Sequence, residues 1–375
     1  MTTVMVFFVL NNSYPNNNNN RYDSLLSLFW SKIIPHCSFR VCLLPLTTFS
    51  NARYGIIASY LVFLPSHLQP TTNIYIYTDT QHIMSNASLI VTDSKEALPL
   101  HLNTAIATLA RQAISERGAF TIALSGGSLP SFLATLHQCF NDDTAMDARW
   151  DKWHILLADE RCVEESHPDS NLGSIRKEFL VHTKIPESQI HGIDAATLKN
   201  GSTQDVATQY ETVVRKVLEQ ASGGILDLAV LGFGPDGHTC SLFPGHPLLQ
   251  ETQHRWVAPI TDSPKPPPNR ITLTFAILNQ YTRHVIVCGA GTSKGPILQK
   301  VIAQISVSDQ GQATTKAYTV DKGIKYEVQI QRNPAPFPCA MVEPNVTSSE
   351  SSTLTWIVDA DAMKAADSIK FASQM

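Results

Sequence analysis

The sequence predicts an α/β protein in which a mostly parallel sheet is covered by helices on both faces. From residue 86 onward, short and nearly continuous apolar runs alternate with amphipathic stretches. Strands of a parallel sheet are buried on both faces and therefore show such unbroken apolar runs. In this architecture ligands bind beyond the carboxyl ends of the strands, so the residues that follow each strand are the candidates for a site.

The first expected unit is a strand at 88–92 followed by a helix that ends at Gly118. Pro99 fixes where this helix can begin, apolar residues recur on one face as far as Ile114, and a glycine at 118 permits a left-handed cap. The runs AFTIAL (119–124) and WHILLA (153–158) predict two further short, buried strands.

The clearest helical pattern covers residues 203–220. Ser202 and Asp205 are spaced as a capping box at its start. The apolar residues that share one face of this helix are Val206, Tyr210, Val213, Val214, Val217 and Leu218. The strand ILDLAVLG (225–232) follows, then a strand at 284–290 and a helix at 293–304, and LTWIVDADAMKAA (354–366) forms the last strand and helix.

Two regions depart from this alternation. Residues 1–84 contain the low-complexity run NNSYPNNNNN and show no sustained period, so we expect a poorly ordered N-terminal extension or sequence upstream of a natural start at Met84. A transit peptide is the less favoured interpretation because arginine is sparse. The domain is expected at 85–375, with a surface insertion at about 306–335 that holds a hairpin around Lys322 and Gly323.

Composition excludes several classes of function. The chain has 28 Lys and Arg against 32 Asp and Glu, without the basic excess that binding to a nucleic-acid backbone requires. No apolar run reaches the ~18 residues of a membrane span. The seven cysteines are scattered and form no Cys-x-x-Cys pair, which argues against a zinc site and favours reduced thiols in the cytoplasm.

Polar or glycine-rich segments follow several of the expected strands. Gly126, Gly127 and Ser128 form a turn before a helix, where backbone N–H groups can bind an anion. Asp159, Glu160 and Arg161 follow another strand. Arg270 opens the run RITLTF, and Lys294 lies at the start of a helix. Each of these segments alone is also compatible with an ordinary turn, strand exit or surface position.

The segment GFGPDGHTCSLFPGHP (232–247) is the most unusual in the chain. It contains more glycine and proline than a reversal of direction needs, and it places Asp236 and His238 directly after a buried strand. Histidine is suited to proton transfer near neutral pH.

In this order, LSGGS, ADER with SNLGSIR, LDLAVLGFGPDGHTCSLFPGHPLL, VAPITDSPKPPPNRITLT and GTSKGPIL resemble the 6-phosphogluconolactonases of the glucosamine-6-phosphate isomerase/lactonase superfamily. The resemblance covers about 86–368 without the 306–335 insertion, and it implies a Rossmann-like layered fold. It also implies hydrolysis of a sugar-phosphate lactone in the oxidative pentose phosphate pathway. No cofactor or metal is expected, because the chain has no His/Cys cluster at zinc spacing and a lactone carbonyl reacts with water and a base. The implied partner is that small molecule alone, with the chain acting as a monomer or weak homodimer.

The resemblance assigns roles to the residues named above. His238 is implied as the catalytic base, and Asp236 as the group that orients it. Asp159 and Arg161 are implied to contact the sugar hydroxyls or the histidine. The expected phosphate ligands are Lys294, Arg270, Gly126, Gly127 and Ser128. Whether Asp159 or Asp236 partners His238 is left open, and Asp159 or Glu160 would be the next candidates for the base.

The chain departs from the family pattern at two places, and the same motifs leave two alternative functions open. Gly295 stands where the family often has alanine, and the 306–335 insertion changes the surface. A glucosamine-6-phosphate deaminase resembles D-G-H-x-x-x-x-E at the histidine turn, but this chain has Phe243 in place of the glutamate. A non-catalytic sugar-phosphate sensor is the other alternative, although no helix-turn-helix pattern precedes residue 86.

Overall fold

The computed structural model describes residues 3–9, 57–63, 83–140, 148–252, 254–305, 317–346 and 352–366. The chain divides into two units, Met1–Asp79 and Thr80–Met375. In the first unit, β1 (Thr3–Val9) pairs antiparallel with β2 (Ile57–Phe63). Most of the expected extension at 1–84 lies outside the described residues, so its lack of order stays a prediction.

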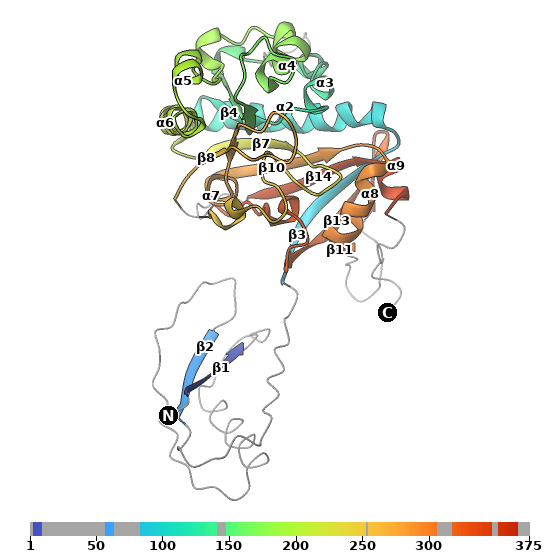
Figure 1. The fold of residues 1–375 in the computed structure, drawn as a ribbon. Coiled ribbons are helices and arrows are strands. Elements are labelled where there is room, and N and C mark those ends of the chain that lie inside the picture. The colour runs from blue at the N-terminus through green and yellow to red at the C-terminus, as the bar shows by residue number, and fades with distance from the viewer. Residues whose placement is uncertain are drawn as a thin grey trace, which may run out of the picture. The chain divides into compact units, whose positions relative to one another are not determined.

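A nine-stranded sheet organises the second unit (Figure 1). The strand order is β11-β13-β3-β14-β10-β7-β4-β5, and β12 pairs with β13 beside this path. The neighbours from β3 to β5 are all parallel, which confirms the predicted fold class. The parallel strands are β3 (Ile83–Thr92), β14 (Thr353–Asp359), β10 (Thr282–Gly289), β7 (Leu226–Gly232), β4 (Phe120–Leu124) and β5 (Trp153–Leu157).

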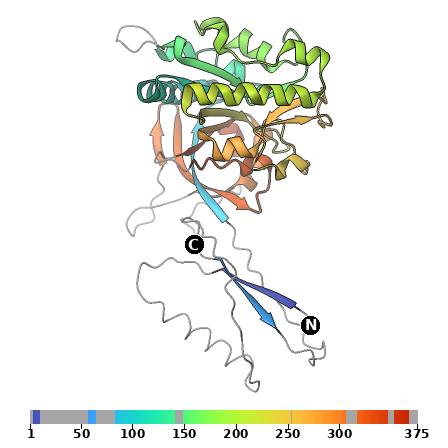
Figure 2. The same cartoon turned by 90° about the vertical axis from the view of Figure 1, so that its left-hand side faces the viewer.

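Two 20-residue helices confirm the strongest helical patterns. In α2 (Leu98–Arg117), Gly118 caps the C-terminus with φ +82°, and in α6 (Thr203–Ser222), Ser202 and Asp205 form the predicted capping box. Figure 1 shows α2 from the side and α6 end-on, and Figure 2 shows the reverse, so the two helices cross. The remaining helices are α3 (Leu129–Phe132), α4 (Asn171–Glu178), α5 (Ala195–Asn200), α7 (Phe275–Gln280), α8 (Gly295–Val301) and α9 (Ala360–Lys364). No helix within these described ranges is long and apolar enough to cross a membrane.

The region after α8 differs from the prediction. The helix expected at 293–304 ends at Val301, and β11 (Ile302–Ile305) follows at once. The predicted hairpin is present as β12 (Ala317–Val320) and β13 (Gly323–Asn333). However, β13 lies between β11 and β3 in the main sheet, and Val328 is 1% exposed. The described part of 306–335 is therefore a sheet extension with buried residues rather than a surface insertion.

A smaller antiparallel sheet lies next to the carboxyl ends of the main strands. It consists of β6 (Asp159–Arg161), β9 (Arg270–Leu273) and β8 (Val257–Ile260) in that order. Its register places Arg161 opposite Arg270, and Asp159 opposite Thr272. The segment Asp159–Arg161, which the sequence placed at a strand exit, and the strand that Arg270 opens are thus neighbours in one sheet.

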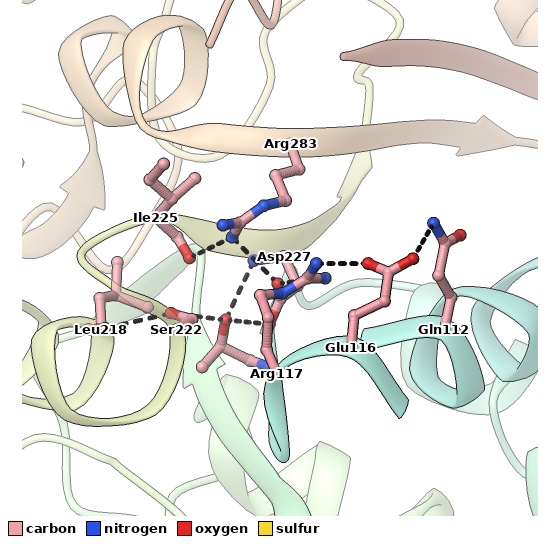
Figure 3. A network of polar contacts seen from close by, with 9 residues as sticks. Gln112, Glu116, Arg117, Leu218, Ser222, Ile225, Asp227 and Arg283 are labelled. Atoms are coloured by element: carbon pink, nitrogen blue, oxygen red, sulfur yellow. Dashed lines mark hydrogen bonds and ion pairs between the residues drawn. The ribbon is translucent and has the colours of Figure 1, made fainter. Parts of the chain in front are cut away.

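At the opposite ends of the main strands, a buried carboxylate joins three elements (Figure 3). Asp227 in β7 is 1% exposed and accepts hydrogen bonds at 2.9 Å from both the backbone N and the hydroxyl of Thr121 in β4. Arg117 at the end of α2 and Arg283 in β10 each approach the other carboxylate oxygen at 3.1 Å. Because a buried charge is costly unless paired, this network fixes the strands relative to α2.

Candidate active site

A pocket of about 220 Å³ lies at the carboxyl ends of β4, β7 and β10 and against the small sheet. This is where ligands bind in open α/β sheets. Eight of the nine predicted site residues line it: Gly126, Gly127, Ser128, Asp159, Arg161, His238, Arg270 and Lys294. The ninth, Asp236, contacts the ring of His238.

Glycines shape the turn that holds the histidine. Gly237 has φ +80°, which glycine adopts without strain, and its N–H donates to the carbonyl of Gly234 at 3.0 Å. A Cβ at Gly234 would lie 2.1 Å from His238 Nδ1. A side chain at Gly234 therefore has no room beside the imidazole, and Gly237 supplies a sharp bend in this turn.

Asp236 is the carboxylate that partners His238. Its Oδ1 lies 2.5 Å from Nδ1 of the imidazole. Partial burial opposes ionisation of Asp236, but the hydrogen bond and charge of His238 and the charge of Lys265 lower its pKa to about 2. An ionised carboxylate only accepts hydrogen bonds, so Nδ1 carries the proton in this contact.

The other ring nitrogen, Nε2, is then the basic one. Among the described residues, the polar contacts of this imidazole are all made through Nδ1. Burial lowers the pKa of His238 below its ordinary value of 6.5, although the hydrogen bond and charge of Asp236 oppose this shift. The neutral imidazole at pH 7 is the form that can accept a proton from water.

Asp159 and Glu160 do not contact the histidine. The Oδ2 atom of Asp159 accepts a hydrogen bond from the Ser241 hydroxyl at 2.7 Å. Its Oδ1 atom lies 3.3 Å from the side-chain amide nitrogen, Nδ2, of Asn171. Glu160 accepts the backbone N–H groups of Asn171 and Leu172 at the start of α4, each at 2.8 Å. Glu160 is therefore committed to the start of that helix, and the prediction that it is a reserve base is not supported by its contacts.

The two arginines of the small sheet differ in their remaining hydrogen-bonding capacity. Arg270 donates to the carbonyls of Pro267, Lys265 and Pro266 and to the Ser241 hydroxyl, at 2.9–3.3 Å. Since a guanidinium has five N–H groups, one remains for a ligand. Arg161 donates from Nη1 to the carbonyl of Asp169 at 2.7 Å. Its buried Nε has no hydrogen-bond partner within the described part of the chain.

Lys294 is held at the pocket by its own turn. Its Nζ donates to the Phe233 carbonyl, and the turn before it is fixed by Asp359, whose Oδ1 accepts from the Gly291 N–H at 2.9 Å. An ammonium group has three donors, so two remain for an anion. A Cβ at Gly295 would lie 2.5 Å from the backbone of Ala365, which explains glycine at this position.

At the glycine-rich turn 126–128, the backbone N–H groups are better candidates for binding an anion than the N-terminus of the helix that follows. The helix that follows, α3, is only four residues long, and a turn and a 3-10 helix (Leu136–Phe140) come after it. The predicted helix N-terminus is therefore too short to contribute much of a dipole. At Gly126 a Cβ would lie 1.7 Å from Asn171 Oδ1, so the backbone approaches α4 closely.

Sequence reasoning missed Lys265 and Ser241. Lys265 Nζ lies 3.3 Å from Asp236 Oδ2 and 3.2 Å from His238 Nδ1. Ser241 joins Asp159 to Arg270. The signal for Lys265 was its position inside the proline run SPKPPP, which restricts the backbone on both sides of one lysine.

Phe243 occupies the position where the deaminase motif has glutamate. Its ring centroid lies 4.9 Å from that of His238, and the residue is 2% exposed. The described residues also contain no group of three or more His, Cys, Asp or Glu side chains arranged to hold a metal ion.

The fold and the pocket define an α/β protein in which an imidazole–carboxylate pair, two arginines and a lysine lie at one pocket. Residues 93–323 match the family model described as glucosamine-6-phosphate isomerases/6-phosphogluconolactonase. This chain belongs to that family.

Relatives are found in plants and animals. The chain is 39% identical over 224 residues to a protein named probable 6-phosphogluconolactonase 3, chloroplastic, from Oryza sativa subsp. indica, with 57% of this chain and 65% of the relative covered. It is 40% identical over 209 residues to the 6-phosphogluconolactonase of Rattus norvegicus, covering 54% of this chain and 79% of the relative. The chain thus spans just under two thirds of the length of the rice relative.

Solved structures support the same fold. The 6-phosphogluconolactonase from Trypanosoma cruzi aligns with a TM-score of 0.55 at 23% identity, covering 76% of this chain and 98% of that one. The 6-phosphogluconolactonase from Thermotoga maritima aligns with a TM-score of 0.53 at 21% identity, covering 72% and 99%. At these identities the likeness concerns the fold.

Proposed function

We propose that this chain hydrolyses 6-phospho-D-glucono-1,5-lactone to 6-phospho-D-gluconate, the second step of the oxidative pentose phosphate pathway. The observation that carries the proposal is the His238–Asp236 pair at 2.5 Å in a pocket that also contains Arg161, Arg270 and Lys294. The names of the rice and rat relatives support the same reaction. A non-catalytic sugar-phosphate sensor only binds its ligand and transfers no proton, so it does not require an imidazole–carboxylate pair.

In the proposed reaction, Nε2 of His238 takes a proton from water as the water oxygen attacks the lactone carbonyl carbon. The bond from that carbon to the ring oxygen then breaks, and the imidazolium returns the proton to the ring oxygen. Asp236 holds the proton on Nδ1 and stabilises the imidazolium that forms between these steps. Water supplies the only added atoms and His238 the base, so the proposed steps involve no cofactor.

The phosphate of the substrate provides binding energy that orients the ring. Lys294 has two donors available and is the main proposed ligand, together with the backbone of Gly126, Gly127 and Ser128. Arg270 offers one remaining N–H, and Arg161, which lines the pocket, has further N–H donors on its Nη atoms beside the one given to Asp169. Asp159 is proposed to accept from a sugar hydroxyl, since Ser241 and Asn171 leave room on a carboxylate that has about four acceptor positions.

Lys294→Ala is expected to lower kcat/KM for the phosphorylated lactone by a factor corresponding to about 1.5–3 kcal/mol, the range for a hydrogen bond to a charged group. Hydrolysis of the unphosphorylated lactone should change little. Steady-state kinetics on both lactones check this, and equal losses on the two would contradict the phosphate assignment.

Arg270→Ala should instead lower kcat/KM for both lactones, because Arg270 also holds the backbone of residues 265–267.

The pH dependence follows from the lowered pKa of His238. Because the neutral imidazole is the active form, kcat/KM should fall as the pH drops through that pKa, with a midpoint below 6.5. The unphosphorylated lactone is the control, because a phosphate group itself ionises near pH 6. A midpoint above pH 7 on both lactones would contradict a desolvated, neutral base.

Glucosamine-6-phosphate deamination is the competing reaction in this family. The buried Phe243 beside His238 provides no acid for opening the sugar ring. The test is to offer freshly prepared 6-phosphogluconolactone and glucosamine 6-phosphate to the purified chain. Acid release from the lactone above its spontaneous rate, without ammonia from the amino sugar, is the expected result. Ammonia release alone would refute the proposal.

A cytoplasmic location and a monomeric or weakly dimeric state are parts of the same proposal. The five cysteines in the described residues are free, in keeping with a reducing compartment. Because the rice relative is named as chloroplastic, microscopy of the tagged full chain is the test of location.

A further inference from the structure

The lysine in the proline run lies where it can act on the histidine pair without being part of the pocket lining. Its Nζ is 3.3 Å from Asp236 Oδ2 and 3.2 Å from His238 Nδ1. Since Nδ1 donates its proton to Asp236, the ammonium of Lys265 gives its hydrogen bond to the carboxylate and acts on the ring through its charge.

The backbone of Lys265 is fixed by two neighbours. Ser263 Oγ donates to the Lys265 carbonyl at 2.8 Å and accepts from the Lys265 N–H at 3.2 Å. Arg270 Nη2 donates to the same carbonyl at 2.9 Å. Most of the donors of Arg270 are therefore used to hold the segment that carries this lysine, which gives the buried arginine a role beyond phosphate binding.

We propose that Lys265 is a positioning residue whose ammonium group, next to the His238–Asp236 pair, keeps the imidazole neutral through its charge, so that Nε2 is ready to accept a proton. The proposal rests on the proposed hydrolysis and names a residue that tunes its base.

The charged groups around His238 make the direction of the effect unambiguous. Asp236 in the same turn and Asp159 in β6 favour the imidazolium, whereas Lys265 disfavours it. Phe243, which packs on the ring, carries no charge. Removing the lysine charge both ends the repulsion of the imidazolium and leaves Asp236 without its second cation. Both changes raise the pKa of His238.

The test is the pKa of His238, measured by NMR titration of the full chain without substrate, with the signal assigned by its loss in His238→Asn. Lys265→Met is expected to raise this pKa by at least about 0.5 to 1 pH unit, the effect of one charge at ~4 Å when it is screened as in bulk water. Lys265→Gln should do the same, and Lys265→Arg should restore the wild-type value. Lys152→Met is the matched control, because Lys152 also pairs with an aspartate and its side chain is 38% exposed against 41% for Lys265.

The acid limb of kcat/KM for the unphosphorylated lactone should move upward by the same amount in Lys265→Met. An unchanged or lowered pKa of His238 in folded Lys265→Met or Lys265→Gln would overturn the proposal. Failure of both variants to fold would also overturn it, because Lys265 would then be a structural residue. The titration needs no turnover, so a protein that does not hydrolyse the lactone would refute the proposed function while the NMR result still decides the role of Lys265.

Discussion

Replacing His238 with asparagine should lower kcat for the lactone by about 10²-fold or more, the contribution that a general acid–base group usually makes. The loss arises because the amide cannot take the proton from water, whereas the contacts proposed for the phosphate come from other elements and should leave KM nearly unchanged. The measurement is acid release at fixed pH, with the spontaneous hydrolysis of the lactone subtracted.

Asp236→Asn is the partner variant for this prediction. It should lower kcat in the same direction but by a smaller factor, because Asp236 orients the imidazole and does not transfer the proton to the substrate. A folded His238→Asn protein with near-normal kcat would show that the turn at 232–247 is only scaffolding, with Asp159 the next candidate for the base.

Asp227→Asn should destabilise the chain by about 3 kcal/mol or more, because breaking a buried ion pair leaves charge without compensation. Asp227 faces two arginines in a network that joins α2, β4, β7 and β10 (Figure 3). For a domain of this size, the loss corresponds to a decrease in Tm of roughly 6 to 12 °C. Thermal unfolding followed by circular dichroism measures it.

The control for the stability prediction is Asp151→Asn, since Asp151 pairs with Arg149 and Lys152 at the surface, where such pairs contribute little. Its Tm should stay within about 4 °C of wild type, in line with a change of under 1 kcal/mol. Because Asp227 lies at the strand ends away from the pocket, kcat of Asp227→Asn below its Tm should remain near the wild-type value. A Tm equal to wild type would contradict the structural role given to this network.

Local patterns made much of the fold predictable. The capping box at Ser202 and Asp205 and the left-handed cap at Gly118 depend on neighbouring residues, and the structure contains both. The apolar runs likewise predicted the parallel strands, since burial on both faces leaves a direct trace in the sequence. The turn at 232–247 could also be predicted from local sequence, because the positive φ at Gly237 is a property of the backbone that favours glycine.

The features that sequence reasoning missed depend on pairing between distant segments. The position of β13 beside β3 joins residues more than two hundred positions apart, and alternating residues in 323–333 do not reveal whether the strand is at the surface or inside the sheet. Lys265 and Asp236 are 29 positions apart in the chain, so their ion pair had no local signal beyond the proline run around the lysine.

The most direct measurement of the central claim is a crystal structure of the chain with 6-phosphogluconate bound. The account predicts the product carboxylate beside His238, with an oxygen about 2.6–3.2 Å from Nε2 or joined to it through one water, and the phosphate against Lys294 and the backbone of residues 126–128. A complex in which the phosphate lies against His238, or in which the product binds outside this pocket, would contradict the assignment of His238 as the base.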